Sequence, residues 1–320
     1  MPDATLFLPS APTDDASAPL PRLAALERLM ARSAVSRRPC AEPAQWMCEA
    51  FGVARQQDWP AAPLALLADG GDPGAGYWLC ATPVHMQVRR DQMLMMPPRM
   101  LVVAPEESAA LVAALAGHFA AEGYEVHAPT ATGWYLRCPA PPDLRTTSPD
   151  LAAGRPVDPL LPAGRDRLVF HRLMNEAQML LHEHPVNDAR EARGLPAINS
   201  LWLWGGGTLP QVATSPWPRV DSTRPLDRGL ARLSGVPEGA TGARAEPAGL
   251  HVAADGLALA DLERDGAAPL LEALARGELD RVDIATVAAG EARQWRVRRA
   301  DLRRFWRREA TPAALLGEAR

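Results

Sequence analysis

The sequence predicts an α/β fold, with α+β as the alternative, in which a mixed sheet is flanked by helices and a smaller α/β unit follows at the C-terminus. The clearest signal is a strand–helix–strand succession at residues 100–138, where Pro105 opens the helix and Gly123 follows its end. A second signal is the helical pattern at 166–183, whose apolar side chains fall on one face. With 320 residues, 47% of them hydrophobic, the chain is long enough to bury a sizeable core.

Residues 1–58 are predicted to be an N-terminal tail followed by docking helices. Residues 1–20 are rich in Pro, Ala, Ser and Asp, which is typical of a frayed segment. Residues 21–33 place four apolar side chains on one helical face, and a second short helix is expected at 44–51.

Residues 59–207 are predicted to form the main α/β domain. The short apolar run at 63–71 ends in a glycine-rich turn, so it is expected to be a buried strand. Prolines exclude regular structure from 139–164, which is expected to be an ordered loop laid over the domain. The other expected elements are strands at 77–88, 100–103, 124–128 and 133–138 and helices at 105–123 and 166–183.

Two further segments complete the chain. Residues 208–248 are rich in Pro, Gly and Ser and are expected to be a linker or an extended covering segment. Residues 249–320 are expected to form a small C-terminal α/β unit that ends in the basic aromatic segment 292–309. The simplest interpretation of this segment is a strand and a helix with arginines in solvent and Val297, Leu302, Phe305 and Trp306 packed inward. The alternative is a patch for an anion or a partner, formed by Arg296, Arg299, Arg303, Arg307 and Trp306.

Composition limits the classes of partner. The formal net charge of −4 provides no global basic field, so nucleic acid is not an expected partner. The chain lacks both a run of roughly 18 apolar residues and a signal peptide's basic region, so we expect a soluble cytoplasmic protein with no membrane partner. The four cysteines are widely spaced, which favours reduced buried thiols over zinc ligands. We expect neither a metal nor a cofactor.

The densest cluster of functional residue types is HEHPVNDAREARGLPAINSLWLWGGG at 182–207. Pro185 ends the preceding helix, and Asn187 is predicted to be the N-cap of a short helix that Gly194 closes. The remainder is expected to be a buried strand that runs into a glycine turn, where backbone or ligand can approach closely.

Five residues of this segment are candidate ligand-binding residues: His184, Asn187, Arg190, Arg193 and Asn199. Arg190 and Arg193 are three residues apart, so they share a helix face and could clamp a carboxylate or phosphate. A solvated arginine face is the simpler interpretation. The segment is not an HExxH zinc motif, because position 186 is Val and Pro185 interrupts the helix.

The segment resembles the cofactor-independent phosphoglycerate mutases of the archaeal type, whose intervening domain carries a similar His-Pro-Val-Asn, then Arg, Gly and Asn, before a strand that ends in glycine. It resembles still more closely the RpfE-type regulatory proteins related to those mutases. The likeness extends over about residues 60–210 through YWLCATPVHMQVRRDQMLM, GWYLRCPAPP and NEAQMLLHEHPVN. Thr82 stands where the Ala-Asp-Pro-Val-His version of the first of these motifs has an Asp.

The resemblance to the mutases implies a two-metal phosphatase-like core with an early Asp, a Ser nucleophile and several late Asp and His ligands. Here His251 is the only histidine beyond His184, and no Asp-His pair occurs in the chain. The resemblance therefore implies a mutase-like intervening domain without the catalytic centre, and we assign no catalytic residue.

Three hypotheses about function follow. The first is a noncatalytic regulatory or ligand-sensing pseudoenzyme of the RpfE type, with a small phosphorylated acid or a regulatory protein as its partner. The second is an active metal-dependent mutase-like isomerase or phosphatase. The third is an interaction protein that acts through its C-terminal Arg/Trp segment. Metal content and phosphatase activity separate the first two.

Overall fold

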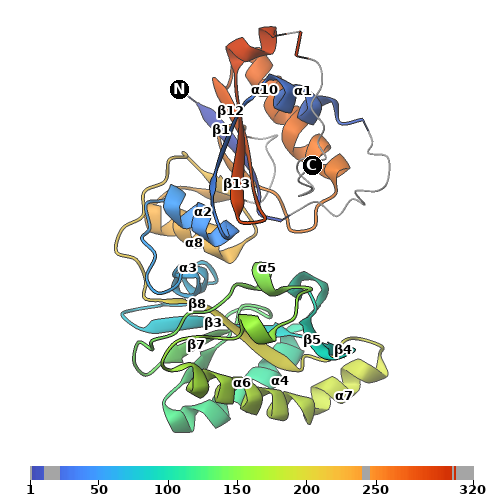
Figure 1. Ribbon diagram of the computed structural model, residues 1–320. Helices are drawn as coiled ribbons and strands as arrows, with labels where there is room; N and C mark the ends of the chain where they lie inside the picture. The colour runs from blue at the N-terminus through green and yellow to red at the C-terminus, as the bar shows by residue number, and fades with distance from the viewer. Residues whose placement is uncertain (1, 11–21, 240–245, 305, 308–320) are drawn as a thin grey trace. The chain divides into compact units, whose positions relative to one another are not determined.

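The computed structural model describes residues 2–10, 22–239, 246–304 and 306–307. The chain forms two compact units, which are described separately (Figure 1). Unit 1 combines Met1–Gly52 with Val212–Arg320, and unit 2 is Val53–Gln211. This division differs from the four segments expected from the sequence, because N-terminal and C-terminal strands pair in one sheet.

Unit 1 contains a seven-stranded mixed sheet in the order β10-β9-β11-β1-β12-β13-β2. Its central strand β1 (Asp3–Leu8) is parallel to both of its neighbours, whereas the pairings of β12 with β13 and of β13 with β2 are antiparallel. This mixed sheet with flanking helices confirms the predicted α/β class. The other strands are β2 (Ala34–Pro39), β9 (Val220–Asp221), β10 (Glu238–Gly239), β11 (Gly249–Val252), β12 (Arg281–Ala288) and β13 (Glu291–Arg298).

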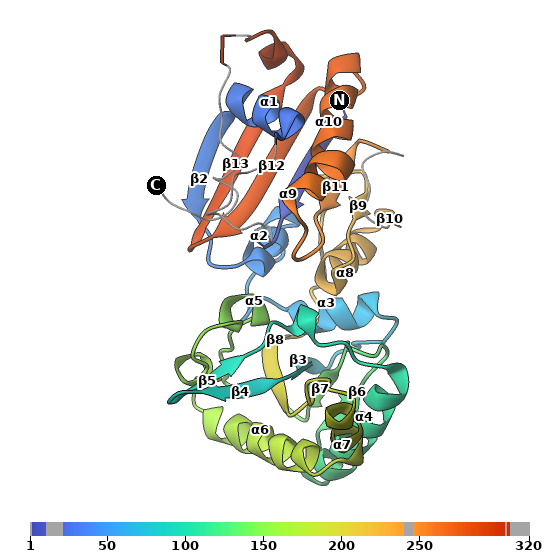
Figure 2. The same cartoon turned by 90° about the vertical axis from the view of Figure 1, so that its right-hand side faces the viewer.

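Helices cover both faces of this sheet. Alternate residues of β1 and β12 point into an apolar core with α1 (Ala24–Arg32) and α10 (Ala268–Arg276), which cross one face in Figure 2. On the other face, Phe7 of β1 stacks on Trp46 of α2, with ring centroids 4.1 Å apart. The remaining helical segments are α2 (Pro43–Ala50), α8 (Pro225–Ser234), α9 (Leu259–Asp261), the π-helical turn Leu262–Ala267 and the 3₁₀ turn Arg299–Arg303.

Two expectations for the segments of unit 1 were wrong. Within the part expected to be frayed, Asp3–Leu8 is the central strand, because Ala4, Leu6 and Leu8 gain a buried face against α1 and α10; residues 11–21 lie outside the described residues. The segment expected to be a linker contains α8, which begins at Pro225 and ends at Gly235 in the left-handed conformation. Its apolar side chains Leu226 and Leu230 are buried.

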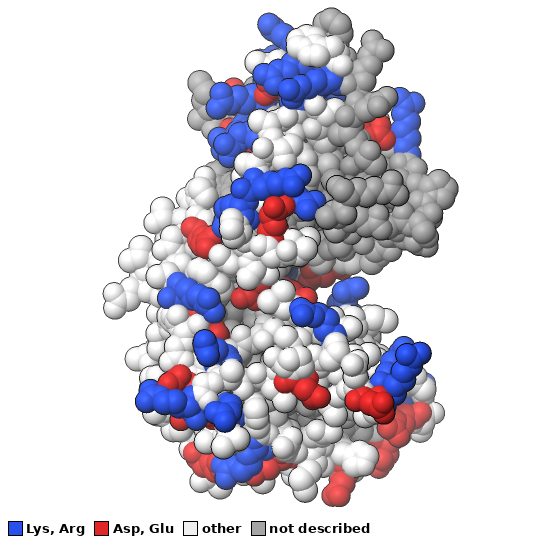
Figure 3. Space-filling view, viewed as in Figure 1, with Lys and Arg blue, Asp and Glu red and all other residues white. Residues whose placement is uncertain are grey.

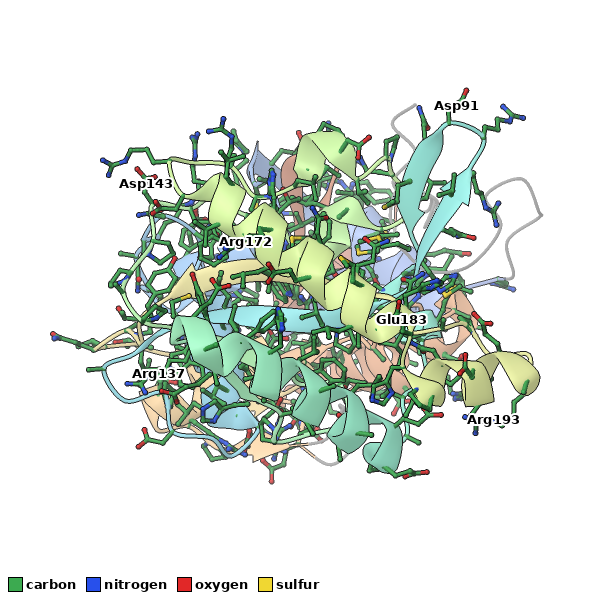
Figure 4. The ribbon with its side chains drawn as sticks, turned by 90° about the horizontal axis from the view of Figure 1, so that it is seen from below. Asp91, Arg137, Asp143, Arg172, Glu183 and Arg193 are labelled. Atoms are coloured by element: carbon green, nitrogen blue, oxygen red, sulfur yellow. The ribbon has the colours of Figure 1, made fainter. Side chains whose placement is uncertain are left out.

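Unit 2 contains an antiparallel sheet in the order β6-β7-β3-β8 and a separate hairpin of β4 and β5. Helices α4 and α6 lie side by side along one face of the sheet (Figure 4) and enclose the core with it. The strands are β3 (Tyr77–Val84), β4 (Met86–Arg89), β5 (Gln92–Met95), β6 (Glu125–His127), β7 (Tyr135–Cys138) and β8 (Ser200–Gly207). The helices are α3 (Ala61–Ala68), α4 (Pro105–Phe119), α5 (Pro149–Ala152), α6 (Arg167–His182) and α7 (Pro185–Ala192), with 3₁₀ turns at Pro98–Met100, Ala120–Glu122 and Asp158–Leu160.

The opposite face of this sheet is covered by α3, where the sequence suggested a strand. The run AAPLALLA is apolar on every side, so it has no periodicity to distinguish a buried helix from a buried strand, while Ala and Leu favour the helix. Residues 101–103 are also not a strand. The segment 139–164 was expected to lack regular structure, but it contains the short helix α5 and the 3₁₀ turn Asp158–Leu160, because the prolines there occupy first-turn positions, where a helix tolerates them. Helices α1, α2, α4 and α6 occur where their patterns predicted them. Among the described residues, no helix is long and apolar enough to cross a membrane.

Candidate functional site

The segment 182–207 lies in unit 2 and joins α6, α7 and β8. His184, not Asn187, is the N-cap of α7: its Nδ1 accepts a hydrogen bond from Val186 N–H at 3.3 Å. The predicted cap at Asn187 was wrong because Pro185 occupies the first helical position, which places Asn187 inside the first turn.

Asn187 is a buried connector between three elements. Its Nδ2 donates to the carbonyls of Leu181 at 2.7 Å and Ile198 at 2.9 Å, and its Oδ1 accepts from Ile198 N–H at 2.8 Å. The amide therefore joins the end of α6 and the approach to β8 from its position in α7. With both donors and the acceptor engaged, its side chain fixes the local backbone.

Asn199 forms the same kind of connection at the start of β4. Its Oδ1 accepts from Met86 N–H at 2.7 Å, and its Nδ2 donates to the Met86 carbonyl at 2.8 Å. Together these bonds reproduce the pairing that a neighbouring strand would provide. Asn199 thus fixes the β3–β4 corner relative to the segment that leads into β8.

Arg190 is buried, so the expectation that it lies on an exposed helix face was wrong. Its side chain is 1% exposed, its Nε donates to the Pro196 carbonyl at 2.8 Å, and its Nη1 forms an ion pair with Glu107 Oε2. Arg193 binds the other oxygen of Glu107 but is 55% exposed, and Figure 4 shows its side chain on the outer side of α7. The two arginines do share a face, and an internal carboxylate lies between them.

Glu107 is the member of this cluster that sequence reasoning did not assign to it. It is the third residue of α4, where its Oε2 accepts from Ala104 N–H at 3.1 Å. Burial alone would raise the pKa of the Glu107 carboxyl, but the Ala104 and Arg193 hydrogen bonds and the charge of Arg190 lower the pKa below its ordinary value. The acidic pair after Pro105 indicated a helix start, but no local signal linked it to α7.

The glycine run at the end of β8 accommodates neighbouring protein atoms rather than an open space. A Cβ on Gly205 would lie 2.8 Å from Ala61 Cβ, and one on Gly207 would lie 2.7 Å from Pro60 Cβ. At Gly206, the atom that a Cβ would meet at 2.5 Å is the Tyr77 hydroxyl oxygen. The missing side chains therefore allow β8 to pack against the start of α3 and against β3.

Thr82 also has a structural partner. Its hydroxyl accepts a hydrogen bond from Trp204 Nε1 at 2.8 Å, on the strand next to it in the sheet. Thr82 thus holds the indole of Trp204 across the two strands.

The C-terminal residues that the sequence grouped as one patch lie in different surroundings in unit 1. Arg296 extends from β13 and binds the buried carboxylate of Asp283. Arg299 and Arg303 are exposed, Arg307 donates to the Ser33 carbonyl at 3.3 Å, and Trp306 is 65% exposed. Val297 packs inward as expected and Trp306 does not, whereas Phe305 and residues 308–320 lie outside the described residues.

Chemistry by a metal ion would need clustered ligands. Within the described ranges, no group of three or more His, Cys, Asp or Glu side chains could hold a metal ion. The four cysteines are free and buried, and burial raises the pKa of the Cys138 thiol to about 12.

Comparisons with known proteins identify relatives of part of this chain. A 2,3-bisphosphoglycerate-independent phosphoglycerate mutase of Methanothrix thermoacetophila is 40% identical over 70 residues, which are 22% of this chain and 18% of the enzyme. A probable enzyme of the same name from Geobacter sulfurreducens is 33% identical over 108 residues, 31% of this chain and 27% of that protein. This chain contains a phosphoglycerate-mutase-like domain.

The solved structure of the PH0037 protein from Pyrococcus horikoshii is similar in fold, with a TM-score of 0.52 at 14% identity. It aligns over 99% of this chain and 92% of its own length. No family model matches the chain. The sequence matches to the two mutases thus span less than a third of either protein, and the fold likeness extends over both units of this chain.

Proposed function

We propose that this protein is a noncatalytic, cytoplasmic regulatory or ligand-sensing protein of the RpfE type, built on its phosphoglycerate-mutase-like domain. The observation that carries the proposal concerns His251, the only histidine after His184 in the sequence. It is buried, with Nδ1 3.0 Å from Asp221 Oδ2 and Nε2 3.0 Å from the Pro247 carbonyl oxygen. The single candidate for a late histidine ligand of the mutase kind therefore faces protein atoms with both ring nitrogens.

The competing function is a metal-dependent mutase or phosphatase. The names of the matched relatives favour a mutase. Two-metal phosphoryl transfer requires several carboxylates and imidazoles to meet at one point. In this sequence the residues of the mutase-like segment are engaged elsewhere: Arg190 with Glu107, Asn187 with backbone, and His184 as a helix cap. This use of the motif for internal contacts supports the noncatalytic proposal.

We expect the purified protein to show no conversion of 3-phosphoglycerate to 2-phosphoglycerate with Mn²⁺ or Zn²⁺. The physical reason is that the cations would lack the imidazole ligands that hold them in the mutases. A coupled assay with an active archaeal mutase as positive control measures this, together with the metal content of the protein. Robust metal-dependent conversion would overturn the proposal.

The ligand in this proposal is a small phosphorylated or carboxylate acid, and Arg193 is the group that reaches it. Arg193 is half exposed, whereas Arg190 is held inside by Glu107 and the Pro196 carbonyl. In thermal melts, 3-phosphoglycerate should raise the melting temperature of the parent protein. It should not raise that of the Arg193→Ala variant. If no phosphorylated acid stabilises the parent protein, the proposed ligand class is wrong.

A second candidate function is association through the C-terminal segment, favoured by the exposed ring of Trp306 beside the exposed Arg307. Aromatic rings and arginines together bind single-stranded nucleic acid or acidic partners. The net charge of the chain is nevertheless negative, and on the face shown in Figure 3 unit 2 carries acidic and basic side chains interspersed.

We therefore expect DNA binding to be weak and independent of sequence. Affinity from a few arginine–phosphate contacts falls steeply as salt rises, because it depends on the release of counterions from the DNA. Fluorescence anisotropy with two unrelated duplexes at 50 and 200 mM salt measures this. Nanomolar, sequence-selective binding at the higher salt would contradict the expectation.

A further inference from the structure

Unit 1 contains a cavity of about 500 Å³ against the face of its sheet that carries α2. Its floor is formed by β1, β12 and β13, where Thr5, Asp283 and Arg296 occupy adjacent register positions. The alternate residues Leu6, Ile284 and Trp295 point into the core on the opposite face. The polar floor therefore arises from the period-two alternation of three neighbouring strands.

The cavity is not at the edge of the sheet where ligands of α/β proteins usually bind. That edge lies beyond the carboxyl ends of the parallel strands. The cavity instead contacts Asp3 and Thr5 of β1 and Arg281 and Asp283 of β12, which belong to the first halves of two parallel strands. It is therefore separate from a site at the carboxyl ends of these strands.

A buried carboxylate organises the floor. Asp283 is 2% exposed and accepts from Gln294 Nε2 at 2.8 Å and from Arg296 Nε at 3.1 Å. Arg281 lies next to it, with Nε 3.5 Å from Asp283 Oδ2 and Nη2 2.8 Å from Asp3 Oδ2. Arg296 uses its Nε–Nη2 edge for Asp283, so the N–H groups of Nη1 can be directed to a ligand.

An aromatic wall stands beside this floor. Trp46 is stacked between Phe7, at a centroid distance of 4.1 Å, and Trp217, at 5.9 Å. Trp217 Nε1 donates to Thr5 Oγ1 at 2.9 Å, which fixes the second indole relative to the floor. Both tryptophans line the cavity, but Trp46 is buried between Phe7 and Trp217, so the partly exposed Trp217 is the ring on which a ligand can pack an apolar face.

The charges around the cavity identify the class of ligand. Three arginines and three acidic residues line it, and each arginine is paired with one of these acids: Arg38 with Glu49, Arg281 with Asp3, and Arg296 with Asp283. A charged ligand must compete with one of these ion pairs. A hydroxyl group does not have to break an ion pair. It can donate to a free lone pair of a carboxylate and accept from a guanidinium N–H that the ion pair does not use.

We propose that this cavity binds a neutral mono- or disaccharide, whose hydroxyls contact Arg296, Gln294 and Arg281 and whose C–H face packs on Trp217. The volume is within the range of roughly 300 to 1,000 Å³ that is usual for small-molecule sites. The inference is independent of the proposed regulatory function, because that function concerns Arg193 of unit 2.

Isothermal titration calorimetry of the full chain tests the inference with glucose, galactose, mannose, maltose, sucrose and trehalose as probes. At least one should bind with a Kd below about 1 mM. Leucine and 3-phosphoglycerate are the charged comparison ligands, and neither should displace the bound sugar. The inference is overturned if no sugar of the panel binds, or if leucine or 3-phosphoglycerate displaces a sugar that does bind.

Two variants locate the sugar in the cavity. Gln294→Leu keeps both arginines on Asp283 and should weaken binding at least fivefold, and Arg296→Leu should weaken it at least tenfold. Arg298→Ala is the matched control, because it lies two residues along the same strand and does not line the cavity. If Arg296→Leu does not fold, Gln294→Leu alone decides. A sugar that binds the Gln294→Leu variant as tightly as the parent excludes this site. Whether or not a sugar binds, the results expected from the mutase assay and from the melts with 3-phosphoglycerate stay the same, so the two proposals are tested separately.

Discussion

Replacing Arg190 with alanine is expected to lower the free energy of unfolding by about 3 kcal/mol, because it breaks a buried ion pair from one side. The guanidinium is 1% exposed and contacts Glu107 and the Pro196 carbonyl. Its removal leaves Glu107 in a largely buried position with Arg193 and the Ala104 N–H as its remaining partners. Chemical denaturation of parent and variant measures the difference.

Arg193→Ala is the matched control for this prediction. Arg193 binds the same carboxylate from a side chain that is 55% exposed, and exposed pairs contribute about 0–1 kcal/mol. Two arginines of one helix, three residues apart and bound to one glutamate, should thus differ severalfold in their effect on stability. Equal effects of the two substitutions would contradict the structure around Glu107.

The pH dependence of stability gives a second readout of the same cluster. Because the pKa of Glu107 is lowered in the folded protein, its ionised form contributes stability at pH values above its unfolded pKa of about 4.3. This contribution is lost as the pH falls through the lower folded pKa. The stability gap between the parent and Glu107→Gln should therefore be constant near neutral pH and shrink in acid below pH ~4.

The Glu107 cluster also marks the limit of what the sequence could predict. Arg190 has Asp188, Glu191 and Arg193 close to it in the sequence and a helical spacing typical of a solvated face, and nothing local indicates burial. Its partner is 83 residues away, on α4. A side chain that is buried by a distant element cannot be identified from the periodicity of its own helix, which is why the expected exposure was wrong.

The same reasoning explains which elements were predictable. Helices α4 and α6 carry their own signals, since Pro105 is the first residue of α4, Asp166 precedes α6, and apolar residues recur on one face. Strand β1 carries little local signal, because its neighbours β11 and β12 are more than 230 residues away in the sequence. The cavity of unit 1 was missed for this reason as well, although Asp283 between two apolar residues of β12 is the kind of buried polar position that indicates a specific partner.

The sequence allowed two explanations for the glycines at 205–207: close packing of the protein backbone, or close approach of a ligand. Substitution of Gly205 is the other change for which we expect a large effect on stability. Gly205→Ala should destabilise the protein by about 3 kcal/mol. Gly205 has φ +66, a left-handed conformation that costs a residue with a Cβ roughly 1–2 kcal/mol. The added Cβ would also lie 2.8 Å from Ala61 Cβ at the start of α3, and overpacking of this kind costs about 1–3 kcal/mol.

Gly117→Ala separates this effect from the general consequence of adding a methyl group. Gly117 lies in α4 with an open position at its Cβ and an ordinary helical backbone, so alanine there should stabilise the protein by about 0.5–1 kcal/mol. The two Gly→Ala substitutions should therefore shift the denaturation midpoint in opposite directions. If Gly205→Ala is as stable as the parent, the close approach of β8 to α3 is not what the run of glycines serves, and a ligand that contacts the Gly205 backbone becomes the explanation to test.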